Sequence, residues 1–243
     1  MASTTAEVTY PVRLTGELDS QLSRRMWLVK WLLAIPHHIV LAFLWVGFLV
    51  TTVIAGFAIL FTGRYPRSLF DFNVGVLRWS WRVGFYAYST LGTDRYPPFT
   101  LARTDYPADF DVDYPEHLSR GLVLVKWLLA IPQLIIVGLF TANIPYWWTM
   151  RNDWGSGESA AGISFLELLV LIVGFFLLIT GQYPRALFDL IVGLNRWVYR
   201  VIAYVALMRD EYPPFRLDQG QYEAGNVEPD GPATTPGLTS GPA

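Results

Sequence analysis

Aspartates and arginines recur at matching positions in the two halves of this sequence, and they are the side chains best suited to chemistry. Asp71 and Asp189 are one matching pair, and two carboxylates that meet in a fold can act as general acid and base. Each aspartate, however, starts a helical stripe with a glycine and two arginines, at positions i, i+4, i+7 and i+11. This regular pattern favours a structural role for the aspartates over a catalytic one.

The arginines near these aspartates form a candidate site for anionic groups. Arg67 and Asp71 are four residues apart, which predicts a local ion pair that contributes about 0.2–0.5 kcal/mol on an exposed helix. Because so weak a pair does not explain the recurrence, we hypothesise a network that joins both residues to arginines of the other half. The candidates for lipid binding, partner binding or a structural network are Arg64, Arg67, Asp71, Arg78, Arg82, Arg185, Asp189, Arg196 and Arg200.

Further polar residues fall inside apolar runs. His37 and His38 follow Pro36, but adjacent helical residues point about 100° apart and do not easily share a metal ion. His37 matches Gln133 of the second half, and a structural hydrogen bond is the favoured role, with a proton or ligand role and a metal site as alternatives. Lys30 and Lys126 match each other, and we expect them to extend to lipid headgroups rather than to be buried functional lysines. The candidate intramembrane polar residues are Lys30, His37, Lys126 and Gln133.

Several classes of function have no support in the sequence. There is no cysteine, so disulfides, thiolate nucleophiles and cysteine-based metal sites are excluded. The net charge is −2, and no basic tract indicates a nucleic-acid partner. No catalytic triad, nucleotide-binding loop or zinc-protease motif is present, and we predict no catalytic, cofactor or metal residues.

These residues belong to a unit that occurs twice. TGRYPRSLFDF at residues 62–72 returns as TGQYPRALFDL at residues 180–190, with eight of eleven positions identical. LVKWLLAIP recurs after 96 residues, and DRYPPFTL recurs as DEYPPFRL after 116. We predict a flexible N-terminus at residues 1–9, repeats at 10–103 and 104–217, and a disordered tail at 218–243.

The apolar runs of each repeat predict a pair of transmembrane helices. Hydrophobic residues make up 53% of the chain and charged residues only 16%, as a bilayer selects. The second repeat has gained 22 residues near positions 141–162, and because insertions are tolerated at loops, the runs on either side are predicted to be separate helices. The first repeat would then turn tightly near residues 45–48. One long kinked helix per repeat and a re-entrant hairpin are the alternatives.

The segment after the repeated motif predicts a further helix. Gly63 can end the spanning helix and Pro66 can start the next one. We expect this amphipathic helix to lie at the cytoplasmic interface with its arginines near lipid phosphates, because a third spanning helix would place two arginines in the bilayer. The predicted fold is an all-α integral membrane protein with about four spanning helices in two parallel repeats and short extended cytoplasmic segments.

The distribution of basic residues predicts the orientation. In the hairpin arrangement every lysine and arginine except Arg151 lies on the starting side or next to it. The positive-inside rule then places both termini in the cytoplasm.

YPVRL, LVKWLLAIPH, ILFTGRYPRSLFDF, VGVLRW and DRYPPFTL together resemble the bacterial membrane family known as domain of unknown function 4389, in two tandem copies. The resemblance implies a multi-pass protein of the bacterial cytoplasmic membrane. It brings no established activity and no site residues.

We therefore expect a non-enzymatic scaffold or accessory module that binds anionic lipid headgroups or a membrane partner, including a second copy of itself. The alternative is a small transporter or channel with a polar path between the two hairpins, lined by His37, Gln133 and the lysines. An intramembrane enzyme is the third and least supported class.

Overall fold

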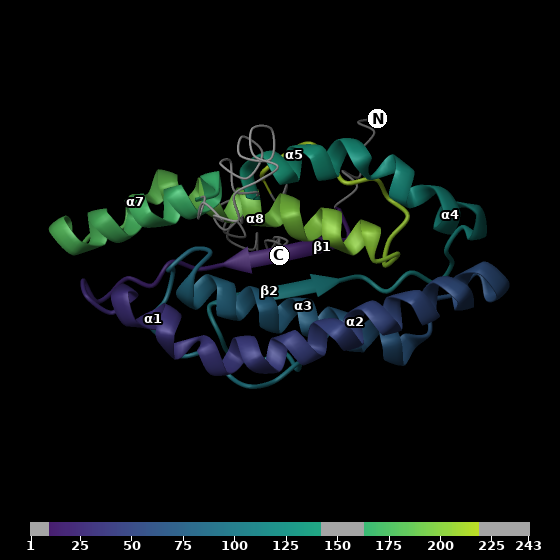
Figure 1. Cartoon of the computed structure of the whole chain (residues 1–243), viewed down its shortest axis with the longest axis horizontal. Coiled ribbons are helices and arrows are strands. Elements are labelled where there is room, and N and C mark those ends of the chain that lie inside the picture. The colour runs from purple at the N-terminus through teal and green to yellow at the C-terminus, as the bar shows by residue number, and fades with distance from the viewer. Residues whose placement is uncertain (1–9, 142–162, 219–243) are drawn as a thin grey trace, which may run out of the picture.

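The structure, a computed structural model, describes residues 10–141 and 163–218, and these residues are mostly helical (Figure 1). The predictions for the N-terminus, the tail beyond Asp218 and most of the insertion, with Arg151, lie outside the described residues. In chain order the elements are β1 (Val12–Gly16), α1 (Trp27–Leu33), α2 (Ile35–Thr62), α3 (Arg67–Ala87), β2 (Ala108–Val112), α4 (Arg120–Leu129), α5 (Ile131–Thr141), α7 (Phe165–Thr180) and α8 (Arg185–Val205).

The predicted turn near residues 45–48 is wrong, because α2 runs as one helix of 28 residues. Residues 45–48 contain a single glycine, Gly47, and nothing that must end a helix, because one glycine costs about 1 kcal/mol. By the sequence match, α5 and α7 correspond to the two parts of α2. The insertion of the second repeat therefore falls at a position that is helical in the first repeat and does not mark a loop common to both.

The described residues do not form the four predicted spanning helices. Within them, α2 alone is long and apolar enough to cross a bilayer by itself. The pair α4 and α5 would count as a second span only as a broken one, because the two helices meet at an angle of 43°. α7 is apolar but has 16 residues, below the usual length of a span.

The predicted helix boundaries at the repeated motif are confirmed. α2 ends at Gly63 and α7 at Gly181, and both glycines have the left-handed backbone that a residue with a side chain rarely adopts. Pro66 and Pro184 then precede the first residues of α3 and α8. The other end of α7 has a capping box, in which Ser164 and Glu167 bond each other's backbone amides.

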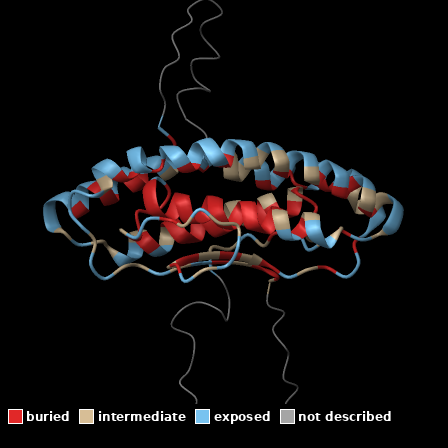
Figure 2. Ribbon diagram, turned by 90° about the horizontal axis from the view of Figure 1, so that it is seen from below, coloured by how far each residue is buried: buried red, intermediate tan, exposed pale blue. Residues whose placement is uncertain are grey.

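The elements form three layers (Figure 2). α1, α2, α4, α5 and α7 form an outer layer with exposed outer sides, and β1 and β2 lie at the opposite face. α3 and α8 lie between them, and sixteen of the 21 residues of α3 are buried. The prediction that this amphipathic helix lies at a membrane interface is therefore wrong, because the glycine and the two arginines of its stripe are covered by protein.

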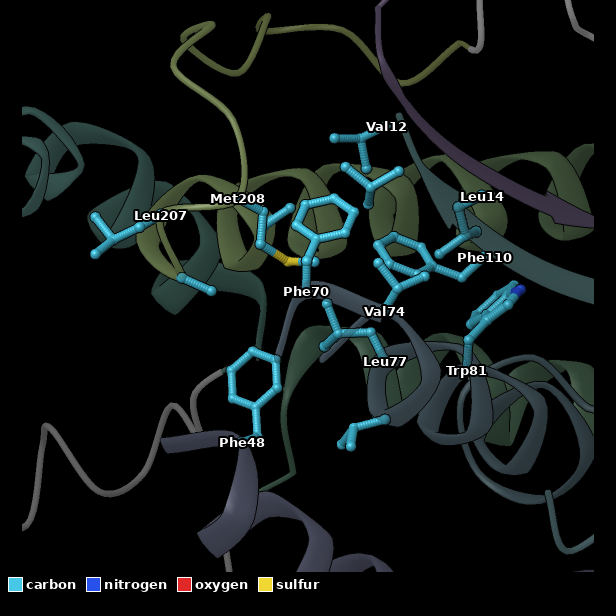
Figure 3. Packing of buried hydrophobic residues seen from close by; sticks show 14 of the residues in the cluster. Val12, Leu14, Phe48, Phe70, Val74, Leu77, Trp81, Phe110, Leu207 and Met208 are labelled. Atoms are coloured by element: carbon cyan, nitrogen blue, oxygen red, sulfur yellow. The ribbon is translucent and has the colours of Figure 1, made fainter. Parts of the chain in front are cut away.

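The strands join the two repeats. β1 and β2 pair antiparallel, with Leu14 opposite Phe110, and β1 lies against α8 of the second repeat while β2 lies against α3 of the first. Figure 3 shows Leu14 and Phe110 in one core with Val74 and Trp81 of α3. The predicted short extended segments are thus present, and each strand covers the buried helix of the other repeat.

Candidate functional site

The outer layer presents a large apolar face. Its exposed side chains include Phe43 and Phe61 of α2, Leu124 and Leu128 of α4 and Phe175 of α7, and Phe43 is 75% exposed. The five helices carry only four charged residues, of which two are the buried lysines and two lie in the first turns of α4 and α7. We call this surface the apolar face. Soluble monomers rarely expose so continuous an apolar surface.

Lys30 and Lys126 point away from that face. Each side chain is 1% exposed, so the prediction that they extend to lipid headgroups is wrong. Lys30 Nζ lies 2.7 Å from Asp94 Oδ1 and also donates to the Thr93 carbonyl. The second repeat has the same contacts, because Lys126 Nζ lies 2.6 Å from Asp210 Oδ1 and donates to the Arg209 carbonyl.

Both carboxylate oxygens of Asp94 and of Asp210 have a partner, since Oδ1 lies near the lysine and Oδ2 near a backbone amide. Asp94 Oδ2 accepts a hydrogen bond from the Ser23 amide, and Asp210 Oδ2 accepts one from the Ser119 amide. Burial alone would raise the pKa of each carboxyl, but the lysine and the serine amide lower both values below the ordinary range. The aspartates thereby fix the start of α1 and of α4 to the segment that carries YPPF.

His37 and Gln133 occupy matching places beneath that segment. Trp79 Nε1 donates to His37 Nδ1 at 3.0 Å, and Trp197 Nε1 donates to Gln133 Oε1 at 2.6 Å. Gln133 also donates to the Pro213 carbonyl, whereas His37 Nε2 is buried without a hydrogen-bond partner and its ring stacks on Phe99. His38 lies apart and contacts the Ala34 carbonyl. The contacts of His37 are those of a packed structural residue.

The stripe arginines bind backbone carbonyls at the end of the segment that carries YPPF, residues 94–102 in the first repeat and 210–218 in the second, which we call the crossing segment. Arg82 donates to the Ala102 carbonyl and Arg200 to the Asp218 carbonyl, and both side chains are almost fully buried. Arg78 and Arg196 donate to the matching Leu101 and Leu217 carbonyls, and each is 9% exposed. These four arginines are covered by protein and do not face lipid phosphates.

Glycines in the stripe allow this close crossing. A Cβ at Gly75 would lie 2.7 Å from Leu101 Cβ, and one at Gly193 would lie 2.8 Å from Leu217 Cβ. Aspartate, glycine and two arginines therefore recur because the end of each repeat crosses this face of the helix.

Arg78 and Arg196 also bond the outer edges of the sheet. Arg78 Nε donates to the Phe110 carbonyl of β2, and Arg196 Nε donates to the Leu14 carbonyl of β1. Unpaired carbonyls at a sheet edge are a template for association with another chain. The arginines occupy these two carbonyls from within the fold.

The outer side of the sheet carries an ion-pair network that the sequence did not predict. Asp109 and Asp111 both pair with Arg78 and with Arg103, and Arg13 joins the network through Asp111 and Asp113. Alternate residues of a strand share a face, so the sequence DFDVD could have indicated a line of carboxylates. Their arginine partners come from other elements and have no fixed spacing.

Arg64, Arg67, Asp71, Arg185 and Asp189 are the predicted site residues that remain exposed. The predicted pair of Arg67 and Asp71 is confirmed at 3.3 Å, and the Arg67 guanidinium also lies over the Tyr114 ring of the second repeat. A polar groove of 510 Å³ lies beside Arg67, Asp71 and Arg78, and one of 210 Å³ lies beside the matching Arg185, Asp189 and Arg196. Asp71 and Asp189 line separate grooves, so they do not form a carboxylate pair.

The described residues contain no group of three or more histidines, cysteines and carboxylates that could hold a metal ion. A third cavity of 320 Å³ is lined mainly by apolar residues, including Trp27 and Trp31 of α1 and Leu171 of α7. The polar residues that the sequence singled out are thus distributed over internal contacts, two surface grooves and the rim of the apolar face.

Comparison with known proteins identifies the family. No curated protein and no solved structure matches the chain. The sequence model of one family matches two segments, residues 24–100 and 160–216, which together exceed half of the chain and agree with two tandem copies. The chain belongs to the family described as "Domain of unknown function (DUF4389)".

Proposed function

We propose that this protein is a non-enzymatic membrane module whose apolar face lies among lipid acyl chains while the sheet faces water. The observation that supports it is the apolar face itself, in which five helices expose aromatic and aliphatic side chains and turn both of their lysines inward. In water this face would drive aggregation, whereas in lipid it has a favourable environment.

The charged sheet side supports one orientation. Asp113, Arg103 and Arg13 are part of an exposed or half-exposed ion-pair network there, and charged groups in the bilayer centre are costly. The three layers therefore lie parallel to the membrane. In this arrangement α2 lies along the membrane as part of a layer, and the helices do not cross it as separate hairpins.

Both ends of the described chain lie on the sheet side. Tyr10 donates from its hydroxyl to the Glu211 carbonyl, and the Asp218 carbonyl accepts from Arg200. We therefore propose that the sheet side is the cytoplasmic side of the bacterial cytoplasmic membrane.

A scaffold or accessory role fits the polar residues better than transport. His37, Gln133 and the two lysines each contact aromatic rings, carbonyls or carboxylates of their own repeat. A transport path would need polar groups that face a shared aqueous route. We propose that the module binds anionic lipid and presents its sheet side to a membrane partner or to a second copy.

Flotation with neutral phosphatidylcholine vesicles tests this function. The full chain should float with the vesicles after a wash at high salt, because apolar burial does not depend on ionic strength. A variant with Phe43→Asp, Phe57→Asp and Leu128→Asp should lose flotation but keep its helical circular dichroism in detergent. The matched control, with Thr15→Asp and Arg103→Asp on the sheet side, should float. Flotation of the first variant at the wild-type level would contradict the proposal.

A further inference from the structure

Most basic residues of the described chain already have an acidic or carbonyl partner. Carboxylates lie within ion-pair distance of Lys30, Lys126 and eight arginines, and Arg200 bonds two carbonyls. Arg196 bonds the Leu14 and Leu217 carbonyls. Within residues 10–141 and 163–218, five exposed arginines have no carboxylate within 4 Å. They are Arg24, Arg25, Arg64, Arg120 and Arg185.

Four of these arginines lie at the two ends of the outer layer. Arg64 follows Gly63, where α2 ends, and Arg120 Nε lies 3.6 Å from the place of a Cβ on Gly63. At the other end, Arg24 Nε lies 2.5 Å from the place of a Cβ on Gly181, where α7 ends. Arg25 is next to Arg24 in sequence, whereas Arg185 lies apart and lines the groove beside Glu17 and Asp189. We call these groups the first corner (Arg64, Arg120) and the second corner (Arg24, Arg25).

The corners are more positive than the protein needs for its own helices. A helix C-terminus carries about half a negative charge, which one nearby arginine offsets. Two arginines per corner therefore leave an excess positive charge, and no carboxylate of the described residues lies within 4 Å of these four guanidinium groups.

The position of the corners identifies what neutralises this charge. They border the apolar face, so in the proposed orientation they lie at the depth where acyl chains give way to headgroups. Arginine binds phosphate through a planar fork of N–H donors. We propose that each corner binds the phosphate of an anionic phospholipid, which gives two lipid sites per chain. This inference rests on the proposed membrane function and adds the number of lipid sites and the residues that form them.

Lipid selectivity measured by spin-label electron paramagnetic resonance tests the two sites. The full chain is reconstituted in phosphatidylcholine vesicles that contain a trace of spin-labelled phosphatidylglycerol or spin-labelled phosphatidylcholine. The motionally restricted fraction should be larger for phosphatidylglycerol, and the preference should fall as NaCl is raised. A basic residue near an anionic surface contributes roughly a fivefold preference. Loss of a corner should therefore remove a several-fold share of the selectivity.

The variants separate the corners from general charge. Arg64→Gln with Arg120→Gln, and Arg24→Gln with Arg25→Gln, should each reduce the preference for phosphatidylglycerol, and the four changes together should abolish it. Arg13→Gln with Arg103→Gln removes the same charge as either pair from the sheet side and should leave the preference unchanged. An equal loss in this control, or full selectivity in the fourfold variant, would overturn the two sites.

The same measurement distinguishes this inference from the proposed function. Restricted phosphatidylcholine reports the apolar contact alone, and it should be equal in all folded variants. If no lipid is restricted, the proposed function fails, and if both lipids are restricted equally, only the corner sites fail. Sodium phosphate should act no differently from NaCl of equal ionic strength. A selective effect of free phosphate would contradict a lipid headgroup as the ligand.

Discussion

At the scale of single residues, the buried ion pair of Lys30 and Asp94 predicts what happens when one partner is removed. Asp94→Asn should destabilise the protein by about 3–5 kcal/mol, because it leaves the lysine charge buried without its counter-ion. Thermal unfolding in detergent micelles, followed by circular dichroism, measures the effect. The double change Lys30→Met with Asp94→Asn should recover much of the loss. A single variant as stable as the wild type would show that the pair contributes little.

His37 and Gln133 predict an exchange between the repeats. His37→Leu should cost about 1–3 kcal/mol, because the buried Trp79 N–H then lacks an acceptor. His37→Gln should be at least as stable as the wild type, since an amide can accept from Trp79 and donate to the Pro97 carbonyl, as Gln133 does with Pro213. The midpoints of thermal unfolding compare the variants, and a His37→Gln protein less stable than His37→Leu would contradict this.

The sequence located the important polar residues better than it located their partners. Matching of the repeats singled out Lys30, His37 and the stripe arginines, and all of them make internal contacts. Their partners lie in the crossing segment, far along the chain, where no spacing rule applies. The one available signal for these partners was that the lysine and the aspartate before YPPF both recur at matching positions in the two repeats.

At the scale of elements, the crossing of each buried helix by the end of its repeat depends on Gly75 and Gly193. Gly75→Ala or Gly193→Ala should destabilise by about 1–3 kcal/mol, because the new methyl group would overlap a leucine Cβ. Gly138→Ala in α5 is the matched control, because nothing lies within 4 Å of its added Cβ and alanine favours helix. Unfolding in micelles should separate the two classes, and equal effects would contradict the close crossing.

The insertion between α5 and α7 predicts the result of a deletion. Removal of residues 142–163 joins Thr141 to Ser164 and restores the spacing of the continuous helix α2. The shortened chain should fold with α5 and α7 fused into one 28-residue helix, like α2. Hydrogen exchange should show continuous protection across the junction. Rapid exchange there, with the rest of the fold intact, would show that the break is intrinsic.

The wrong prediction of a hairpin has a definite cause. This prediction rests on reading the insertion as a loop common to both repeats, but an apolar helix whose one proline lies in its first turn can be continuous in one copy and carry an insertion in the other. The ends of the helices were predictable, because Gly63, Gly181, Pro66 and Pro184 act through local backbone geometry. A helix continues wherever no residue ends it, and no sequence pattern marks such continuity.

At the scale of the whole molecule, the sequence predicted helices and an apolar surface but not the order of the layers. An amphipathic stripe shows that one side of α3 is polar, and membrane interface and protein contact both satisfy that pattern. In this fold the stripe of α3 is a protein contact, because β2 and the YPPF segment cover it. Long-range pairing of β1 with β2 across the repeats is a tertiary property that local periodicity does not encode.

The central claim is that the apolar face lies in lipid and the sheet in water, and site-directed spin labelling tests it most directly. The chain has no cysteine, so single cysteines can be introduced without a background label. In vesicles, labels at Phe43, Leu128 and Phe175 should be accessible to oxygen and protected from a water-soluble nickel complex. Labels at Thr15 and Arg103 should show the opposite pattern. Nickel access at the first three positions, or lipid exposure of the sheet positions, would contradict the proposed orientation.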